Sequence, residues 1–254
     1  MTNEKATSRV RLRREGRVAR IVVGTGERRN ALTGADWHEL RVIFDAMADD
    51  GDLAVAVVRG SGATFSSGAD IAEWQRASQA EVDETFTLME SAFEAIERAP
   101  VPVIAVIEGV AAGAGCELAL SCDIQLASAS ARIGMPIARL GILLSPLFAA
   151  RMIALVGPSR TLELIYSGRL VSAPEAARIG MITRAVGDER LDVEVEDLAR
   201  SVVDLPTAAT RAAKESVGAL LAPLREHASH AGRQSAINYP DFTRGVEAFL
   251  HHNL

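Results

Sequence analysis

The chain has 254 residues, 48% of them hydrophobic, which is enough for one full-sized hydrophobic core and permits one domain or two. A formal net charge of −6 argues against a nucleic-acid-binding surface, and no apolar run is long enough to span a membrane. Residues 1–8 are polar and lack the apolar run of a signal peptide. Composition therefore favours a soluble, cytoplasmic protein that contacts neither nucleic acid nor membrane.

A β-hairpin is predicted at the start of the chain. Arginines mostly alternate with Val10, Leu12 and Val18 around a turn at Glu15-Gly16, which is typical of two strands with one solvated face. A patch that binds a polyanion is the alternative interpretation. The arginines concerned are Arg9, Arg11, Arg13, Arg14, Arg17 and Arg20.

Strands and helices then alternate along the chain. Thr33 and Asp36 predict a capping box for a helix that ends near residue 48, and a second helix spans roughly residues 81–98. A third helix carries Glu117. This alternation predicts an α/β domain. The predicted strands are 18–24, 54–58, 103–107 and 123–127.

The second half of the chain is mostly helical. Ser145 and Pro146 predict a helix start, and 172–175 predicts a capping box for a helix that ends at Gly180. Beyond Asp188 the predicted helices are separated by Pro206, Pro223 and Pro240. We therefore expect a single domain over residues 1–254, with an α/β core at about 1–190 and a helical part at about 191–254.

Cys116 and Cys122 are the two cysteines of the chain. Six residues apart on one predicted helix or its end, they point in different directions, so a disulfide between them is not expected. Reduced thiols fit a cytosolic protein.

Two loops can each present backbone N–H groups at the start of a helix. The glycine-rich stretch 109–115 precedes a helix with Glu117 in its first turn, and the stretch 65–71 also opens into a helix. The free N–H groups of two such helix starts can be aimed at one carbonyl oxygen. Such a pair of donors stabilises a developing oxyanion.

In their order and separation, these loops resemble those of the crotonase (enoyl-CoA hydratase/isomerase) superfamily, and the resemblance covers nearly the whole chain. It implies a spiral of ββα turns with a helical C-terminal part, assembled as a homotrimer or a dimer of trimers. It also implies an acyl-CoA thioester of fatty acid metabolism as substrate, with coenzyme A as part of that substrate, no separate cofactor and no metal. The motifs that carry it are Arg29-Asn30-Ala31-Leu32, Phe65-Ser66-Ser67-Gly68-Ala69-Asp70-Ile71, Gly113-Ala114-Gly115-Cys116-Glu117-Leu118-Ala119 and Cys122-Asp123-Ile124.

The resemblance assigns catalytic roles to three residues. The backbone N–H groups of Ala69 and Ala114 match the oxyanion-hole donors, and Glu117 matches the first catalytic glutamate of enoyl-CoA hydratases. The family commonly has glycine at the position of Ala114, and the added methyl narrows the pocket or shifts the donor if glycine's backbone freedom is needed. A carboxylate among Leu118, Ala119 and Leu120 is costly to bury without a partner or a task.

The second catalytic glutamate of the hydratases is missing, since Ile137 occupies the matching position. This puts the two-carboxylate hydration mechanism in doubt. Arg139 is a candidate to donate a hydrogen bond or to pair with Glu117, although it cannot act as a base. Ser145 is a candidate to orient a water, with helix capping as the plainer explanation. Asp70 is expected to start a helix rather than to act in catalysis.

The remaining predicted site residues concern binding. Arg28 or Arg29 is a candidate partner for a phosphate of CoA, with a solvated turn as the alternative, and Trp74 and Met89 are candidates for the acyl tunnel. None of the histidines has a recognisable metal or triad spacing. Substrate-binding positions also include Ala31, Ser67, Gly68, Asp70, Ile71, Gly113, Ile137, Arg139 and Ser145.

Three functions fit these observations. The first is an acyl-CoA enzyme that forms or quenches a thioester enolate, by hydration or by double-bond isomerisation. The second is a non-catalytic acyl-CoA-binding protein with a dismantled acid–base pair. The third is decarboxylation or thioester hydrolysis with the same oxyanion hole.

Overall fold

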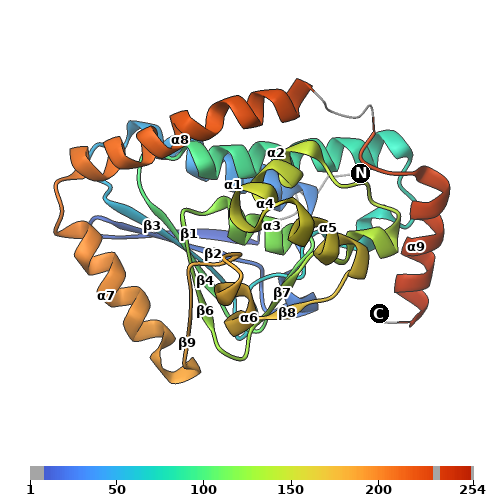
Figure 1. Ribbon diagram of the computed structural model, residues 1–254, viewed down its shortest axis with the longest axis horizontal. Helices are drawn as coiled ribbons and strands as arrows, with labels where there is room; N and C mark the ends of the chain where they lie inside the picture. Colours follow the sequence, from blue (N-terminus) through green and yellow to red (C-terminus); the bar gives the residue numbers. More distant parts are fainter. Residues whose placement is uncertain (1–8, 231–234, 253–254) are drawn as a thin grey trace, which may run out of the picture.

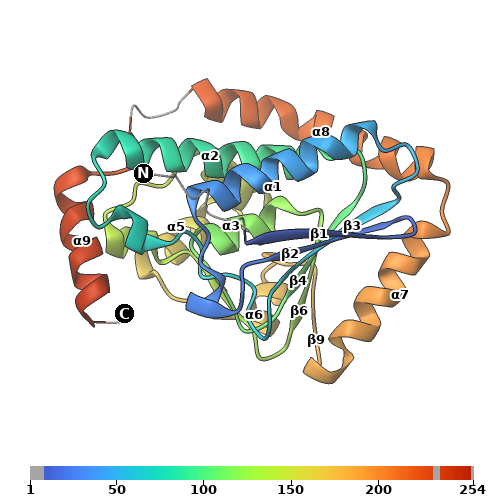
Figure 2. The same ribbon diagram turned by 180° about the vertical axis from the view of Figure 1, so that it is seen from behind.

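The computed structural model describes residues 9–230 and 235–252. A large β-sheet lies below a layer of helices, in which α2 (Gln79–Arg98) and α8 (Thr207–His230) extend across one side of the molecule (Figure 1). From behind, α1 (Gly34–Ala46) is seen along the same side (Figure 2). Helices α7 (Leu191–Val203) and α9 (Tyr239–His252) lie at opposite ends.

The main sheet has six strands in the order β1-β2-β3-β4-β6-β9. The first two pair in an antiparallel hairpin, which confirms the prediction, and every further pair in this sheet is parallel. Crossover helices on a parallel sheet cover its faces, so its strands are apolar on both sides. The strands are β1 (Val10–Glu15), β2 (Val18–Val23), β3 (Val55–Gly60), β4 (Val103–Ile107), β6 (Ile124–Ser128) and β9 (Arg184–Val186).

Strand β3 shows how the two sides of this sheet are covered. Val55 and Val57 pack in a cluster with residues of α7, whereas Ala56 and Val58 belong to the larger core on the other side. This follows from the alternation of side chains along a strand. The larger core lies on the side of α1 and α2, where the cavity described below is also formed.

A second, three-stranded sheet supports the glycine-rich loop. It has the order β5-β7-β8, with β5 parallel to β7 and β7 antiparallel to β8. Its first strand ends one residue before Gly113, so the sheet fixes where α3 (Ala114–Ser121) begins. The strands are β5 (Val110–Ala112), β7 (Arg132–Gly134) and β8 (Val171–Ser172).

The helix starts follow local sequence. The capping box of Thr33 and Asp36 is present at α1, as predicted, and Ser78 and Glu81 form a second one at α2. Ser145 caps α4 by accepting a hydrogen bond from the Phe148 N–H. The remaining helices are α4 (Pro146–Val156), α5 (Pro158–Ser167), α6 (Ala173–Arg178) and the 3-10 helices η1 (Glu27–Asn30), η2 (Met47–Asp49), η3 (Ile71–Trp74), η4 (Pro136–Leu140) and η5 (Asp188–Arg190).

Two local predictions are wrong in part. Ser172 caps α6, but the reciprocal bond of a capping box is absent, because the Glu175 carboxylate pairs with Arg169 instead. Pro223 does not separate two helices and lies inside α8. Contacts on both sides of it hold that helix in place, since Lys214 pairs with Asp123 and Arg225 pairs with Glu97.

The structure is thus mixed α/β with a helical C-terminal part, as predicted. Both cysteines are buried and unbridged. None of the described helices is long and apolar enough to cross a membrane.

Candidate active site

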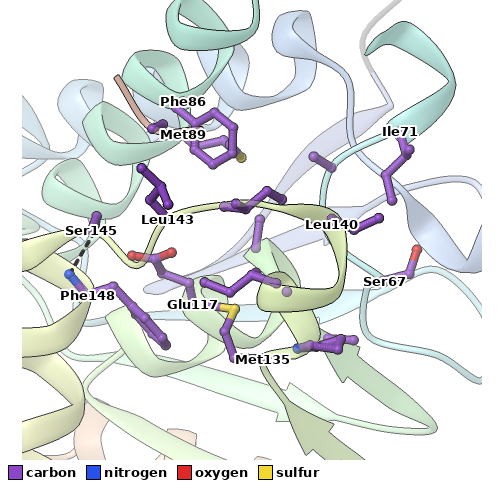
Figure 3. Close-up of a pocket in the computed structure, with 18 of the residues that line it drawn as sticks. Ser67, Ile71, Phe86, Met89, Glu117, Met135, Leu140, Leu143, Ser145 and Phe148 are labelled. Carbon is purple, nitrogen blue, oxygen red and sulfur yellow. Dashed lines mark hydrogen bonds between the residues drawn. The ribbon is translucent and has the colours of Figure 1, made fainter. Parts of the chain in front are cut away.

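A cavity of about 1300 Å³ lies between the two predicted loops, α2, the start of α3, η4 and α4 (Figure 3). The side chain or backbone of every predicted site residue lines it, except for Gly68. Gly68 lies just behind the wall, because a Cβ added to it would be 2.8 Å from the Ala114 nitrogen. The structure therefore brings together residues that are up to 117 positions apart, from Arg28 to Ser145.

A left-handed turn at residues 28–30 positions the loop that carries Ala69. Arg28, Arg29 and Asn30 have positive φ values of 45°, 53° and 55°. The buried Asn30 amide donates hydrogen bonds to the Ser61 and Thr64 carbonyls at 2.9 and 2.7 Å. In return, the Ser67 N–H donates to the Arg29 carbonyl at 2.8 Å. The buried amide offsets the cost of this backbone, which is about 1–2 kcal/mol for each left-handed residue.

Ala69 and Ala114, whose backbone N–H groups are the predicted oxyanion donors, both line the cavity. Within the described residues, neither of them donates to a backbone carbonyl. Only Ala114 begins an α-helix, however, since the loop of Ala69 leads into the four-residue 3-10 helix η3. The stretch 65–71 thus opens into a helix as predicted, but a short 3-10 helix, so an α-helix dipole acts at only one of the two predicted donors. Asp70 caps η3 as expected, by accepting a hydrogen bond from the Ala72 N–H.

Glu117 projects into the cavity and pairs with Arg151, a residue that the sequence analysis did not single out. Nη1 of Arg151 lies 2.8 Å from Oε1 of Glu117. The candidate partner Arg139 lines the cavity but makes no ion pair with Glu117, so of its two suggested roles only that of a hydrogen-bond donor stays a prediction. Arg139 is on η4, whereas Arg151 projects from α4 toward α2 and α3.

Arg151 is the centre of a buried charge cluster. Its side chain is only 6% exposed, and it also pairs with Glu90 at 2.6 Å and with Glu97 at 2.8 Å. Its guanidinium lies 5.7 Å from the ring centre of Phe93. The three carboxylates raise the pKa of Arg151 above its ordinary value, although burial acts the other way.

Burial raises the pKa of Glu117 to about 8, and the charge of Glu90 adds to the rise, while Arg151 opposes it. Glu117 therefore carries a proton at neutral pH and releases it with little cost. A group with such a pKa can both donate and accept a proton near neutrality, as general acid–base catalysis requires.

The free energy of unfolding is expected to fall as the pH rises from about 4.5 to about 8. In this range the folded chain binds a proton at Glu117 that the unfolded chain, with a pKa of 4.5, has released. Urea unfolding at pH 5.5, 7.0 and 8.5 measures this slope, and Glu117→Gln removes the part that Glu117 contributes. The same slope in both proteins would contradict the assignment.

One wall of the cavity is rich in apolar side chains. Ile137 lines the cavity at the position of the expected second glutamate. Met135, Leu140 and Leu143 line it as well (Figure 3). The Glu117 side chain is only 12% exposed, which is consistent with burial as the largest cause of its raised pKa. Ser145 is at this wall too, but its hydroxyl accepts the Phe148 N–H at 3.0 Å, which favours the capping interpretation.

The candidate phosphate-binding arginines differ in their partners. Arg28 pairs with Asp70 at 3.0 Å, and Arg9, which was not predicted to take part, approaches the same carboxylate at 3.4 Å. Arg29 lines the cavity mouth. Trp74, a predicted acyl-tunnel residue, stacks on Phe86 with ring centres 5.6 Å apart and forms an aromatic wall.

Comparison with known proteins decides the family. The model of the enoyl-CoA hydratase/isomerase family matches residues 13–252. The chain belongs to this family. It is 35% identical over 206 residues to the crotonyl-CoA hydratase of Syntrophomonas wolfei, covering 80% of this chain and 78% of that protein. It is 32% identical over 209 residues to the short-chain-enoyl-CoA hydratase of Clostridium acetobutylicum, covering 81% and 79%.

Solved structures of the family share its fold. An enoyl-CoA hydratase from Mycobacterium avium superposes with a TM-score of 0.85 at 25% identity and covers 97% of each chain. A Thermobifida fusca protein solved in complex with CoA has a TM-score of 0.76 at 33% identity, over 88% of this chain and 92% of that one. The predicted crotonase fold is confirmed, and the chain is an enoyl-CoA hydratase/isomerase-like enzyme.

Proposed function

We propose that this enzyme transfers protons at the acyl chain of a CoA thioester, with the N–H groups of Ala69 and Ala114 as oxyanion donors and Glu117 as the acid–base group. The observation that carries this proposal is the buried Glu117 carboxyl, which has a pKa of about 8 and faces the cavity that both donors line.

Proton transfer at a thioester needs both the oxyanion donors and the acid–base carboxyl. Removing a proton from the α-carbon of a thioester moves negative charge onto the carbonyl oxygen, so donors must already be in place to receive it. One such donor contributes about 10²–10³ in rate. A carboxyl with a pKa near the working pH can take the α-proton and return it.

The cavity can accommodate an extended thioester. The solved relative from Thermobifida fusca binds CoA. In this chain, Arg28 and Arg29 at the cavity mouth are the candidate cations for the CoA phosphates, and Trp74, Phe86 and Met89 supply an apolar wall for the acyl chain. A homotrimer or dimer of trimers, a cytoplasmic location and a single domain stay predictions.

Glu117→Gln is expected to lower the rate of α-proton exchange by about 10²–10⁴-fold, because glutamine cannot transfer the proton. Saturated and 2-unsaturated acyl-CoAs are incubated with the enzyme in heavy water, and deuterium uptake and water addition are read by mass spectrometry. Glu84→Gln, an exposed change on α2, is the control. Saturable binding without any mass change in the wild type would instead identify a non-catalytic acyl-CoA-binding protein.

A further inference from the structure

A second carboxylate of the cavity shares the partner of Glu117. Nη1 of Arg151 donates to Glu117 at 2.8 Å, and Nη2 donates to Oε1 of Glu90 at 2.6 Å. Both nitrogens belong to one rigid, planar guanidinium, so the two carboxylates are held beside each other in a fixed relation. Glu90 lines the same cavity and its side chain is 22% exposed, so solvent or substrate can reach it.

The other described acidic residues that line the cavity pair with groups other than Arg151. Asp70 pairs with Arg28, and Asp83 accepts hydrogen bonds from Ser235 and from the Ala236 N–H. Glu94 pairs with Arg98 one turn along α2. Of the acids on this wall, Glu90 is thus the one that Arg151 places next to Glu117.

Arg151 has another, more deeply buried anchor in Glu97. Glu97 is only 8% exposed, does not line the cavity, and accepts from Nε of Arg151 at 2.8 Å. It also pairs with Arg225 of α8 at 3.2 Å. The buried anchor and the cavity-facing carboxylate are therefore two different residues of α2, seven positions apart on one helix face.

The charges of this cluster favour one shared proton. Arg151 pairs with Glu90, Glu97 and Glu117, and Arg225 pairs with Glu97. Two cations thus stand against three carboxyls, so protonating one carboxyl brings these five groups to neutrality. Burial raises the pKa of Glu90 as well as that of Glu117. A pair of carboxyls that shares one proton offers an acid and a base at the same time.

We propose that Glu90 is the second acid–base group of this enzyme and fills the role that Ile137 cannot. This inference rests on the proposed function. In the addition of water to a 2-enoyl thioester, the Glu90 carboxylate takes a proton from a water molecule, and the oxygen of that water bonds to C3. The C2=C3 electron pair moves toward the thioester oxygen, held by Ala69 and Ala114, and protonated Glu117 then gives its proton to C2.

The atoms balance over this cycle. One O–H bond of water and the C2=C3 π bond are broken, a C3–O and a C2–H bond form, and no electron is gained or lost. The proton left on Glu90 passes to Glu117 through water, which restores the starting state. Glu90 acts on the water, whereas α-proton exchange on a saturated acyl-CoA needs Glu117 alone.

Glu90→Gln in the full chain separates these two activities. Water addition to crotonyl-CoA is expected to fall by about 10²–10⁴-fold. Deuterium exchange at the α-carbon of a saturated acyl-CoA is expected to fall far less, because Glu117 is kept, and its pH profile to shift to lower pH, because a charge that raises the pKa of Glu117 is removed. Glu117→Gln lowers both, and Glu84→Gln lowers neither. Where Glu90→Gln does not fold, Glu90→Asp keeps a carboxylate on a shorter side chain and is expected to slow water addition more than exchange.

Other outcomes overturn the inference. If Glu90→Gln slows both activities in proportion, Glu90 only positions Arg151, and if it slows neither, Glu90 has no part in the reaction. A wild-type enzyme that exchanges the α-proton but adds no water also overturns the inference, while the proposed function stands. A wild type that does neither overturns the proposed function itself.

Discussion

Replacing Arg151 by methionine is expected to lower the free energy of unfolding by about 3–5 kcal/mol. The substitution removes the ion-pair partner of Glu90 and Glu117 and leaves both carboxyls in a largely buried site. Methionine fills much of the same volume, so the loss arises from uncompensated charge rather than from a cavity. Urea or thermal unfolding at pH 7 measures it.

The control for this prediction is Arg98→Met. The Arg98 side chain is 77% exposed and pairs with Glu94 on the surface of α2, so its replacement is expected to cost at most about 1 kcal/mol. The cost of Arg151→Met is also expected to shrink at pH 5, because protonating Glu90, whose pKa burial raises, removes a buried charge that needs a cation. Equal costs for the two substitutions, or a cost at position 151 that does not depend on pH, would contradict this account of the cluster.

Features that depend on a few neighbouring residues could be predicted from the sequence. The hairpin around Glu15-Gly16, the capping box at Thr33 and the cap at Ser145 each follow from local hydrogen bonding, and all three are present. Pro223 shows the limit of such reasoning. Helix α8 runs through it, and its two halves are tied by ion pairs to Asp123 and Glu97, which lie far away in the sequence.

In the candidate site, too, features set by neighbouring residues could be predicted, whereas contacts between distant residues could not. The loop motifs placed Ala69, Ala114 and Glu117 on one cavity, because short motifs set the local backbone and the resemblance supplied their arrangement. Arg139 was expected near Glu117 from its closeness to Ile137 along the chain. Arg151 pairs with both Glu90 and Glu117 because α4 packs against α2 and α3, and no short motif encodes this packing.

One signal in the sequence did point to Arg151. It is the only charged residue of the otherwise apolar helix Pro146–Val156. A single arginine in such a helix must reach a partner or solvent, because an unpaired buried charge is too costly. What the sequence does not reveal is which carboxylates meet it.

Gly68→Ala is expected to reduce α-proton exchange by about 10³-fold or more, since it disturbs the proposed oxyanion donors on both loops. The φ of Gly68 is +97°, a conformation that alanine rarely adopts. The added Cβ would lie 2.8 Å from the Ala114 nitrogen and 2.9 Å from the Ala112 carbonyl oxygen. Both contacts are with backbone, so the loop of Ala69 and the start of α3 must move apart. Mass spectrometry of deuterium uptake measures the rate.

Gly62→Ala separates this clash from the cost of the backbone conformation alone. Gly62 also has a positive φ, of +70°, but an added Cβ there would meet nothing within 4 Å. Both substitutions place an alanine in a left-handed conformation, which costs about 1–2 kcal/mol of stability. Only Gly68→Ala also displaces a proposed oxyanion donor. Gly62→Ala is therefore expected to keep its exchange rate. If the two variants lost activity equally, global destabilisation would explain both, and the position of the Ala114 N–H would not control the rate.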